Sequence, residues 1–249
     1  MQNGTSDRMR WGYRTGEGSK LPTPIEISID SHPNLLLTGG SGSGKSYGLL
    51  YLLGMLLQDS PEIELYILDF KYSEDFEFLD GYEHYFKGNE CYEGVMEYYE
   101  KFCRKRQERN SRKRMMLIFD EYPACYSYLS AIDKREKSKK ASDMANAIAE
   151  ILMLGRGIKC GIWIVTQRAD ASLFANGSRD SFMVILAMGR MSREQRGMLF
   201  AGEDIPDKIY HRGEGCMLAD GHPLYEVAIP KIGNMIDWKK HIKQVLMKK

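Results

Sequence analysis

The chain has 249 residues, of which 43% are hydrophobic and 28% are charged. This size and composition are typical of one soluble α/β domain or of two very small ones, and they exclude a disordered chain, a fibrous repeat and a membrane bundle. Lysine and arginine number 35 against 34 aspartates and glutamates, a formal net charge of +1. Any nucleic-acid contact must therefore come from local basic patches.

The five cysteines are odd in number and none forms a C-x-x-C pair, so a disulfide framework or a zinc ribbon is not expected. Residues 1–18 are polar and glycine-rich, unlike a secretory leader. The longest apolar stretch, residues 48–57, is too short to span a bilayer. We therefore expect a cytoplasmic protein that reaches any membrane only through a partner.

Apolar runs alternate with longer helical patterns, which predicts βαβ units around a mostly parallel sheet. In chain order, the patterns predict a strand over residues 34–38, a helix over 44–57, a strand over 63–70, a helix over 90–109, a strand over 115–119, a helix over 138–154, strands over 161–165 and 182–188, and a short helix over 192–200. Residues 215–219 and 224–229 should form a closing antiparallel pair.

The tail, residues 233–249, is predicted to be a basic amphipathic helix with Trp238, Ile242, Val245 and Leu246 on one face. It either packs on the domain or offers a docking surface for a partner, DNA or an anionic membrane. Residues 1–25 are assigned to an N-terminal extension and residues 26–232 to the main domain.

The strongest motif follows the first predicted strand and precedes the first predicted helix, where residues 39–46 match G-x-x-x-x-G-K-[ST] in full. Its glycines let backbone N–H groups converge on phosphate oxygens, and the helix N-terminus adds positive charge. Lys45 can reach the β- and γ-phosphates, and the Ser46 hydroxyl can ligate Mg²⁺. The expected nucleotide-binding residues are Gly39, Gly40, Ser41, Gly42, Ser43, Gly44, Lys45, Ser46 and Tyr47. The alternative, a chance glycine- and serine-rich turn, does not explain the strand–loop–helix context.

An acidic pair ends the strand predicted over residues 115–119. Ligands of open α/β sheets bind at the carboxyl edge, where Asp120 can hold Mg²⁺ and its water shell. Glu121 can polarise the attacking water as a general base. The alternative is a solvated turn after a core strand.

A third apolar strand, over residues 161–165, runs into Thr166, Gln167 and Arg168. The Gln167 amide can hydrogen-bond the γ-phosphate or the lytic water. An extra strand between the two strands that carry the first motifs is typical of the class of ATPases that hydrolyses with a glutamate.

Taken in order, these motifs resemble the RecA-like motor domain of the FtsK/SpoIIIE DNA translocases, within the FtsK–HerA superfamily. The resemblance covers residues 11–232, and its stretches are LLLTGGSGSGKSYG, ILDFK, LIFDEY, GIWIVTQR and GEGCML. It implies a P-loop NTPase fold with a mostly parallel sheet, flanking helices and C-terminal antiparallel strands. It also implies an ATPase that uses ATP and Mg²⁺ and assembles as a homo-hexameric ring around double-stranded DNA.

Such rings bind ATP between subunits, so the resemblance further implies an arginine supplied by a neighbour. Arg156 falls where the family places that arginine, and Arg196 is a second candidate. Arg156 can instead be a helix-terminal arginine whose positive charge interacts with the negative end of the helix macrodipole.

Two basic stretches stand out, at residues 104–114 and 134–140. The second lies in an insertion after Glu121, and in related motors loops in this region line the central pore. Its basic residues are expected to contact phosphates without reading bases: Lys134, Arg135, Lys137, Lys139 and Lys140. For both stretches the alternative is a solvated, charged surface.

Because neither a membrane-spanning region nor a winged-helix module is expected, the chain looks like a mobile-element protein. One example is a coupling ATPase of conjugative transfer, which meets a membrane channel or a relaxosome. Two other interpretations stay open: a ring ATPase that powers type VII-like protein secretion, and a nucleotide-dependent scaffold that hydrolyses slowly or not at all.

Overall fold

The computed structural model describes residues 8–15, 22–108, 113–168, 180–206 and 208–248. Residues 1–7 and 16–21 of the expected N-terminal extension fall outside them, as do residues 109–112 of the first basic stretch and the last residue of the tail.

One ten-stranded sheet runs through the described residues, in the order β2-β1-β10-β9-β8-β3-β7-β6-β4-β5. From β8 to β5 neighbouring strands are parallel, and from β2 to β8 they are antiparallel. The strands are β1 (Arg8–Thr15), β2 (Thr23–Ser28), β3 (Leu35–Gly39), β4 (Glu64–Asp69), β5 (Tyr85–Lys87), β6 (Met115–Asp120), β7 (Cys160–Thr166), β8 (Val184–Met188), β9 (Glu214–Ala219) and β10 (Tyr225–Ala228). The prediction of a mostly parallel sheet with C-terminal antiparallel strands is confirmed, and β7 is the predicted extra strand between β3 and β6.

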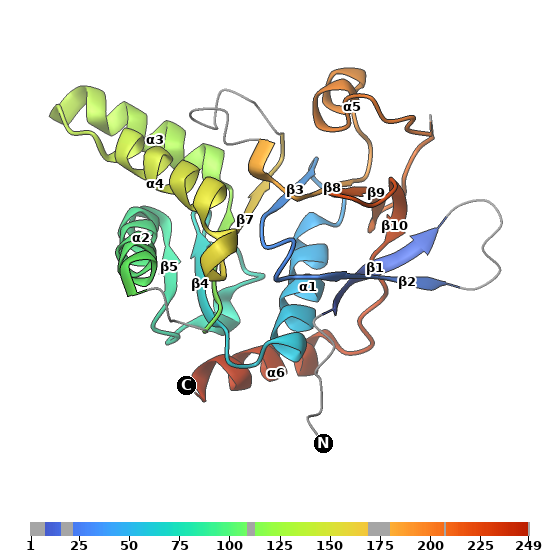
Figure 1. The fold of residues 1–249 in the computed structure, drawn as a ribbon, viewed down its shortest axis with the longest axis horizontal. Coiled ribbons are helices and arrows are strands. Elements are labelled where there is room, and N and C mark those ends of the chain that lie inside the picture. The colour runs from blue at the N-terminus through green and yellow to red at the C-terminus, as the bar shows by residue number, and fades with distance from the viewer. Residues whose placement is uncertain (1–7, 16–21, 109–112, 169–179, 207, 249) are drawn as a thin grey trace.

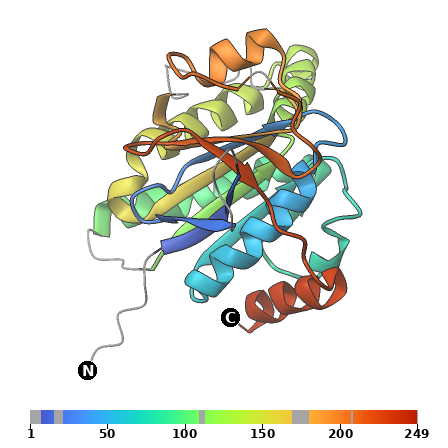
Figure 2. The same cartoon turned by 90° about the vertical axis from the view of Figure 1, so that its right-hand side faces the viewer.

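Helices cover both faces of the sheet (Figures 1 and 2). The α-helices are α1 (Lys45–Asp59), α2 (Cys91–Glu108), α3 (Tyr122–Glu136), α4 (Lys140–Leu154), α5 (Arg193–Leu199) and α6 (Met235–Met247); short 3₁₀ turns are η1 (Glu77–Leu79), η2 (Gly88–Glu90) and η3 (Arg156–Ile158). Leu35 and Leu37 share one apolar cluster with α1 and α6, whereas Leu36 shares the other with α2, α3 and α4. Because the parallel strands are buried on both faces, they are apolar throughout.

Strands β1 and β2 were not predicted. Met9 and Trp11 of β1 are buried, and the Trp11 indole donates to the Ile27 carbonyl at 3.1 Å and lies 5.9 Å from the Trp163 ring. Part of the segment assigned to an N-terminal extension therefore belongs to the sheet. The division of the chain at residues 25 and 232 stays a prediction.

Helix α3 is a second difference, because the sequence analysis treated residues 122–136 as an insertion without a helix. Helices α3 and α4 lie side by side and extend away from the sheet (Figure 1). Asp133 fixes the turn between them by accepting hydrogen bonds from the backbone N–H groups of Lys140, at 3.0 Å, and Ala141, at 2.9 Å. Helix α4 consequently starts at Lys140 and not at residue 138.

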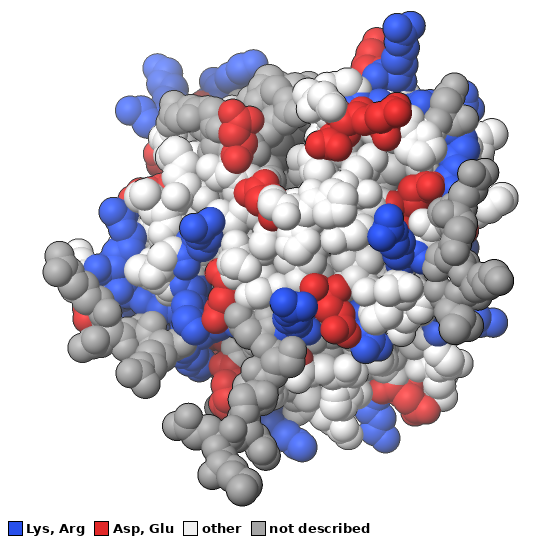
Figure 3. Space-filling view, turned by 45° about the vertical axis from the view of Figure 1, so that its right-hand side comes forward, with Lys and Arg blue, Asp and Glu red and all other residues white. Residues whose placement is uncertain are grey.

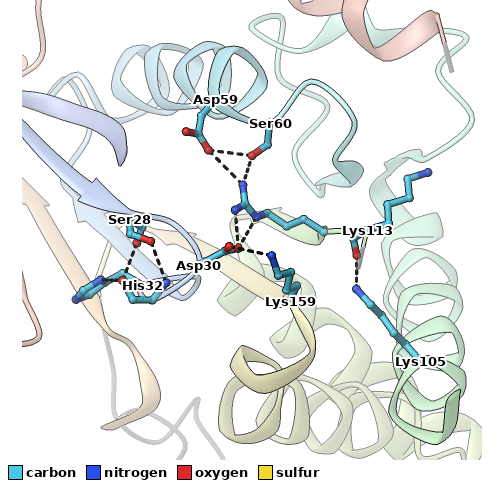
Figure 4. Close-up of polar contacts among 10 residues, drawn as sticks. Ser28, Asp30, His32, Asp59, Ser60, Lys105, Lys113 and Lys159 are labelled. Atoms are coloured by element: carbon cyan, nitrogen blue, oxygen red, sulfur yellow. Dashed lines mark hydrogen bonds and ion pairs between the residues drawn. The ribbon is translucent and has the colours of Figure 1, made fainter. Parts of the chain in front are cut away.

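An ion-pair cluster joins the segment after β2, the end of α1 and the segments before β6 and β7 (Figure 4). Arg114, just before β6, donates to Asp30 at 3.0 Å and to Asp59 at 3.2 Å, and Lys159 donates to Asp30 at 3.0 Å. Burial opposes ionisation of Asp30, but these hydrogen bonds hold its pKa below the ordinary value. Within the first basic stretch, Arg114 is therefore engaged in the fold, and the buried Lys105 donates to the Lys113 carbonyl.

The tail packs on the domain, as the first of its two interpretations predicts. Ile242 and Leu246 of α6 are buried in the same cluster as α1. Trp238 donates to the Leu50 carbonyl at 2.9 Å and stacks on Tyr51. Among the described residues no helix is both long and apolar enough to cross a membrane.

Trp238 packs against Gly54 on α1, and this contact gives a test of the α6 packing. A Cβ at Gly54 would lie 2.1 Å from Trp238 Cζ2. We expect Gly54→Ala to lower the free energy of unfolding by about 1–3 kcal/mol, because the overpacked indole must move. Urea unfolding monitored by tryptophan fluorescence measures the change.

Gly197→Ala on α5 is the matched control, because a Cβ there meets no atom within 4 Å. The helix propensity of alanine should make this variant neutral or slightly more stable. Equal stability of the two variants would contradict the packing of α6 on α1.

Candidate nucleotide-binding site

The phosphate-loop motif forms the turn between β3 and α1. Gly42 and Gly44 have φ values of +79° and +92°, in the left-handed region that favours glycine. A Cβ at Gly44 would lie 2.8 Å from the backbone nitrogen of Gly213. That nitrogen donates to the Ser43 carbonyl at 2.9 Å, so the loop is fastened to the segment that enters β9.

The start of α1 offers unpaired backbone donors. The Gly48 N–H donates to the Gly44 carbonyl at 2.8 Å, and the N–H groups before it have no acceptor within the helix. A buried serine hydroxyl, that of Ser43, also has no hydrogen-bond partner among the described residues. The loop and the start of α1 adjoin a cavity of about 390 Å³, lined by Gly40, Ser41, Gly42, Gly44, Lys45, Ser46, Tyr47, Leu50, Lys71, Ser73, Asp75, Asp120, Glu121, Gln167, Arg212 and Met235. Gly39 and Ser43 are not among these residues, and the Ser43 side chain lies beside Gly39 and Gly189.

Asp120 ends β6 in this cavity, opposite Asp69 on β4 and Val165 on β7. Burial raises the pKa of Asp120 to about 7; the charges of Glu121 and Asp69 add to the rise, while Lys45 and Lys71 oppose it. A divalent cation bound at this carboxylate would offset the cost of burying its charge. The position therefore suits a metal-binding aspartate.

Glu121 has a strained backbone, with φ 59° and ψ 42°, which is uncommon for a residue other than glycine. Its N–H donates to the Val165 carbonyl at 3.0 Å, and its largely buried carboxylate lies 3.1 Å from the Lys71 ammonium and 3.7 Å from that of Lys45. Two lysines from different elements thus hold the carboxylate in the cavity.

Lys71 is a site residue to which the sequence analysis assigned no role. It follows β4, and the buried Asp69 shapes the turn by accepting from the N–H groups of Lys71 at 3.2 Å and Ser73 at 2.6 Å and from the Tyr85 hydroxyl at 3.1 Å. Burial raises the pKa of Asp69, although these hydrogen bonds oppose the rise. The sequence did contain a signal for Lys71. The apolar strand that ends in Asp69 is followed by Lys71, and in the fold this strand lies beside the strand of Asp120 and Glu121.

Gln167 follows β7 and lines the same cavity, so the structure brings together Lys45, Ser46, Asp120 and Gln167 from three strand ends. The hydroxyl of Thr166 donates to the Arg168 carbonyl at 2.7 Å and fixes the turn after the strand.

The two arginine candidates are not among the described residues that line the cavity. Arg156 lies in η3, before the amino end of β7, so it is at the edge of the sheet opposite the phosphate loop. Arg196 lies on α5. The basic residues of the second stretch lie at the end of α3 and the start of α4.

A second cavity, of about 420 Å³, adjoins the first and shares Gly44, Tyr47 and Arg212 with it. Its remaining lining residues are Gly213, Ile229, Lys231 and Ile232. Tyr47 closes one wall, because its hydroxyl donates to the Pro230 carbonyl at 3.4 Å and accepts from the Ile232 N–H. The sequence analysis found Tyr47 by its position after the motif and missed the chain after β10, which meets it only in the fold.

The model of the FtsK/SpoIIIE family matches residues 14–202, which is more than half of the chain. The chain belongs to the FtsK/SpoIIIE family. The FtsK domain-containing protein YdcQ of Bacillus subtilis is 26% identical over 253 residues, and the match covers 93% of this chain and 50% of YdcQ. The chain thus spans about half the length of this relative.

Solved structures share the fold of this chain. The pCW3 conjugation coupling protein TcpA, as a monomer with ATPγS, matches with a TM-score of 0.69 at 16% identity, over 98% of this chain and 75% of TcpA. The cytoplasmic domain of the type VII secretion ATPase EccC of Thermomonospora curvata matches with a TM-score of 0.70 at 18% identity, over 95% of this chain and 30% of EccC. At these identities the likeness concerns the fold alone.

Proposed function

We propose that this FtsK/SpoIIIE-family chain binds ATP with Mg²⁺ and hydrolyses it to move double-stranded DNA. The observation that carries the proposal is the meeting of Lys45, Asp120, Glu121 and Gln167 in one cavity, although they come from distant parts of the sequence. A scaffold without hydrolysis would not need a buried glutamate held between two lysines.

The phosphate loop binds the triphosphate through Lys45 and the free N–H groups at the start of α1. The hydroxyl of Ser46 and the carboxylate of Asp120 are oxygen donors of the kind that Mg²⁺ prefers. Bound magnesium supplies charge neutralisation at the β- and γ-phosphates. Tyr47 and the second cavity accommodate the nucleoside.

Glu121 accepts a proton from the attacking water, and the Gln167 amide orients that water by hydrogen bonding. The Lys45 ammonium cannot contact both Glu121 and the phosphates at short distance. It lies 3.7 Å from the Glu121 carboxylate, farther than the Lys71 ammonium does. On ATP binding Lys45 turns to the phosphates, while Lys71, at 3.1 Å, stays with Glu121.

The DNA-contacting surface is the hairpin tip, which we define as residues 134–140, from the last turn of α3 to the first residue of α4. Lys134, Arg135, Lys137 and Lys139 are exposed there, whereas Lys140 lies over the Tyr92 ring at 5.3 Å. By contrast, the described residues on the face in Figure 3 intersperse Lys and Arg with Asp and Glu.

The working assembly is a homo-hexamer in which a neighbour's Arg156 or Arg196 completes each ATP site. The position of Arg156 at the opposite edge of the sheet supports a role in trans and not in cis. The process that we propose is conjugative transfer with a membrane-channel or relaxosome partner, and the fold shared with the coupling protein TcpA is compatible with it. Protein secretion is the second candidate, because the secretion ATPase EccC shares the fold too.

Duplex DNA is expected to raise the ATPase rate, and the hairpin tip should carry this effect. The variant Lys134→Ala/Lys137→Ala/Lys139→Ala should lose most of the stimulation while basal hydrolysis stays near wild type. Each lost phosphate contact should make the negative slope of log affinity against log salt shallower by about 0.9. ATPase rates and DNA affinity at two salt concentrations measure both effects.

The control removes three exposed charges outside both basic stretches and the tail, with Arg8→Ala/Arg14→Ala/Arg193→Ala. Equal loss of stimulation in both triple variants would contradict the assignment to the hairpin tip. A wild-type rate that is indifferent to duplex DNA would refute DNA translocation and favour the secretion candidate.

A further inference from the structure

Arg212 stands between the two cavities and no part of the mechanism above uses it. It precedes β9 and lines both the phosphate cavity and the adjoining one. Its side chain lies beside the phosphate loop at Gly44, since a Cβ at Gly44 would lie 3.3 Å from Arg212 Cγ. The residue is exposed, so its guanidinium is accessible to a ligand.

The backbone on both sides of Arg212 is fixed to the fold. Gly213 donates to the Ser43 carbonyl at 2.9 Å and accepts from the Ile229 N–H at 2.8 Å. On the other side, the His211 N–H donates to the Glu214 carboxylate at 3.0 Å, and the Glu214 N–H donates to the His211 carbonyl at 3.0 Å. The start of the Arg212 side chain is therefore held in a set place beside the phosphate loop.

The charges around the loop are distributed unevenly. Lys45 and Lys71, on one side, both lie within ion-pair distance of Glu121. On the other side, the described residues that line the second cavity include Arg212 and Lys231 and no carboxylate. An anionic ligand that spans the two cavities would meet Arg212 at their junction.

We propose that Arg212 binds the α- and β-phosphates of the nucleotide held by its own subunit. This inference rests on the proposed function. The α-phosphate is the one next to the nucleoside, so it lies nearest the junction when the nucleoside occupies the second cavity. A guanidinium can hold two phosphate oxygens at once in a fixed fork, which suits this position better than a lysine would.

Nucleotide titrations of Arg212→Gln, which keeps much of the side-chain length and removes the charge, test this role. The Kd values for ADP and for ATPγS should rise by the same factor, on the order of tenfold, because a hydrogen bond to a charged group is lost and the γ-phosphate is not involved. The kcat at saturating ATP should stay near wild type, since the loss is equal in ground and transition states. Arg212→Lys should recover part of the affinity.

Arg104→Ala, an exposed arginine on α2, is the control for removing one positive charge and should bind both nucleotides as wild type does. Wild-type ADP affinity in Arg212→Gln would overturn the inference about Arg212 but not the proposed function. A loss confined to ATPγS would overturn the assignment to the α- and β-phosphates. A lower melting temperature of Arg212→Gln without nucleotide, with the Lys variant equally affected, would show a structural role. Failure of the wild-type chain to bind ADP would refute the proposed function itself.

Discussion

Lys45→Ala is expected to abolish ATP turnover. The lysine side chain is largely buried in the phosphate-loop cavity, and its removal takes away the cation for the β- and γ-phosphates. Loss of one preorganised electrostatic contact to a developing charge costs on the order of 10²–10³-fold in rate. Phosphate release at saturating ATP measures the change, and nucleotide titration shows how far binding is weakened as well.

Lys248→Ala, an exposed lysine after α6, is the control for removing one positive charge and should keep the wild-type rate. Thermal unfolding of both variants checks that the fold is intact, because Lys45 also lies 3.7 Å from Glu121. Unchanged turnover in Lys45→Ala would refute the assignment of the ATP site.

The parallel half of the sheet could be read from the sequence because its strands are buried on both faces. The runs at residues 34–38 and 115–119 became β3 (Leu35–Gly39) and β6 (Met115–Asp120) almost unchanged. Strand β1 was harder, since only one of its faces is apolar and arginines alternate with Met9 and Trp11. That alternation was a usable signal in a segment assigned to an extension.

Helix α3 was missed for a different reason. Its buried residues, Tyr122, Cys125 and Leu129, have helical spacing but are few, and its last turn carries Lys134 and Arg135. Pro123 in the first turn is compatible with a helix start. The charged last turn therefore made the helix hard to predict, although α3 packs on α4. The DNA-contact candidates consequently lie on a helical hairpin and not in a loop insertion.

The residues of the candidate site could likewise be predicted only in part from the sequence. Lys45, Ser46, Asp120 and Gln167 could be found because each follows an apolar strand within a short motif. Lys71 also follows an apolar strand, at the end of the stretch ILDFK, but nothing in that stretch assigns it a role, and Arg212 has no motif of its own. They line the cavity because β4 pairs with β6 and because the turn before the antiparallel β9 lies against the phosphate loop. A local sequence pattern does not predict which strands pair.

The prediction that separates binding from chemistry concerns Glu121. Glu121→Gln should keep ATP bound while kcat falls on the order of 10²–10⁴-fold, because an amide cannot take the proton from water. The substitution also removes the negative charge that Lys45 and Lys71 face, which leaves Lys45 freer for the phosphates, so ATP affinity should be equal or higher. ATP binding and single-turnover phosphate release together measure this separation.

Glu136→Gln, at the exposed end of α3, removes an equal charge away from the cavity and should leave both quantities unchanged. Retained hydrolysis in Glu121→Gln would mean that another base activates the water, and loss of ATP binding would mean that the carboxylate supports the phosphate loop. Only bound but uncleaved ATP agrees with a glutamate that is strained, buried and held by two lysines in order to receive a proton.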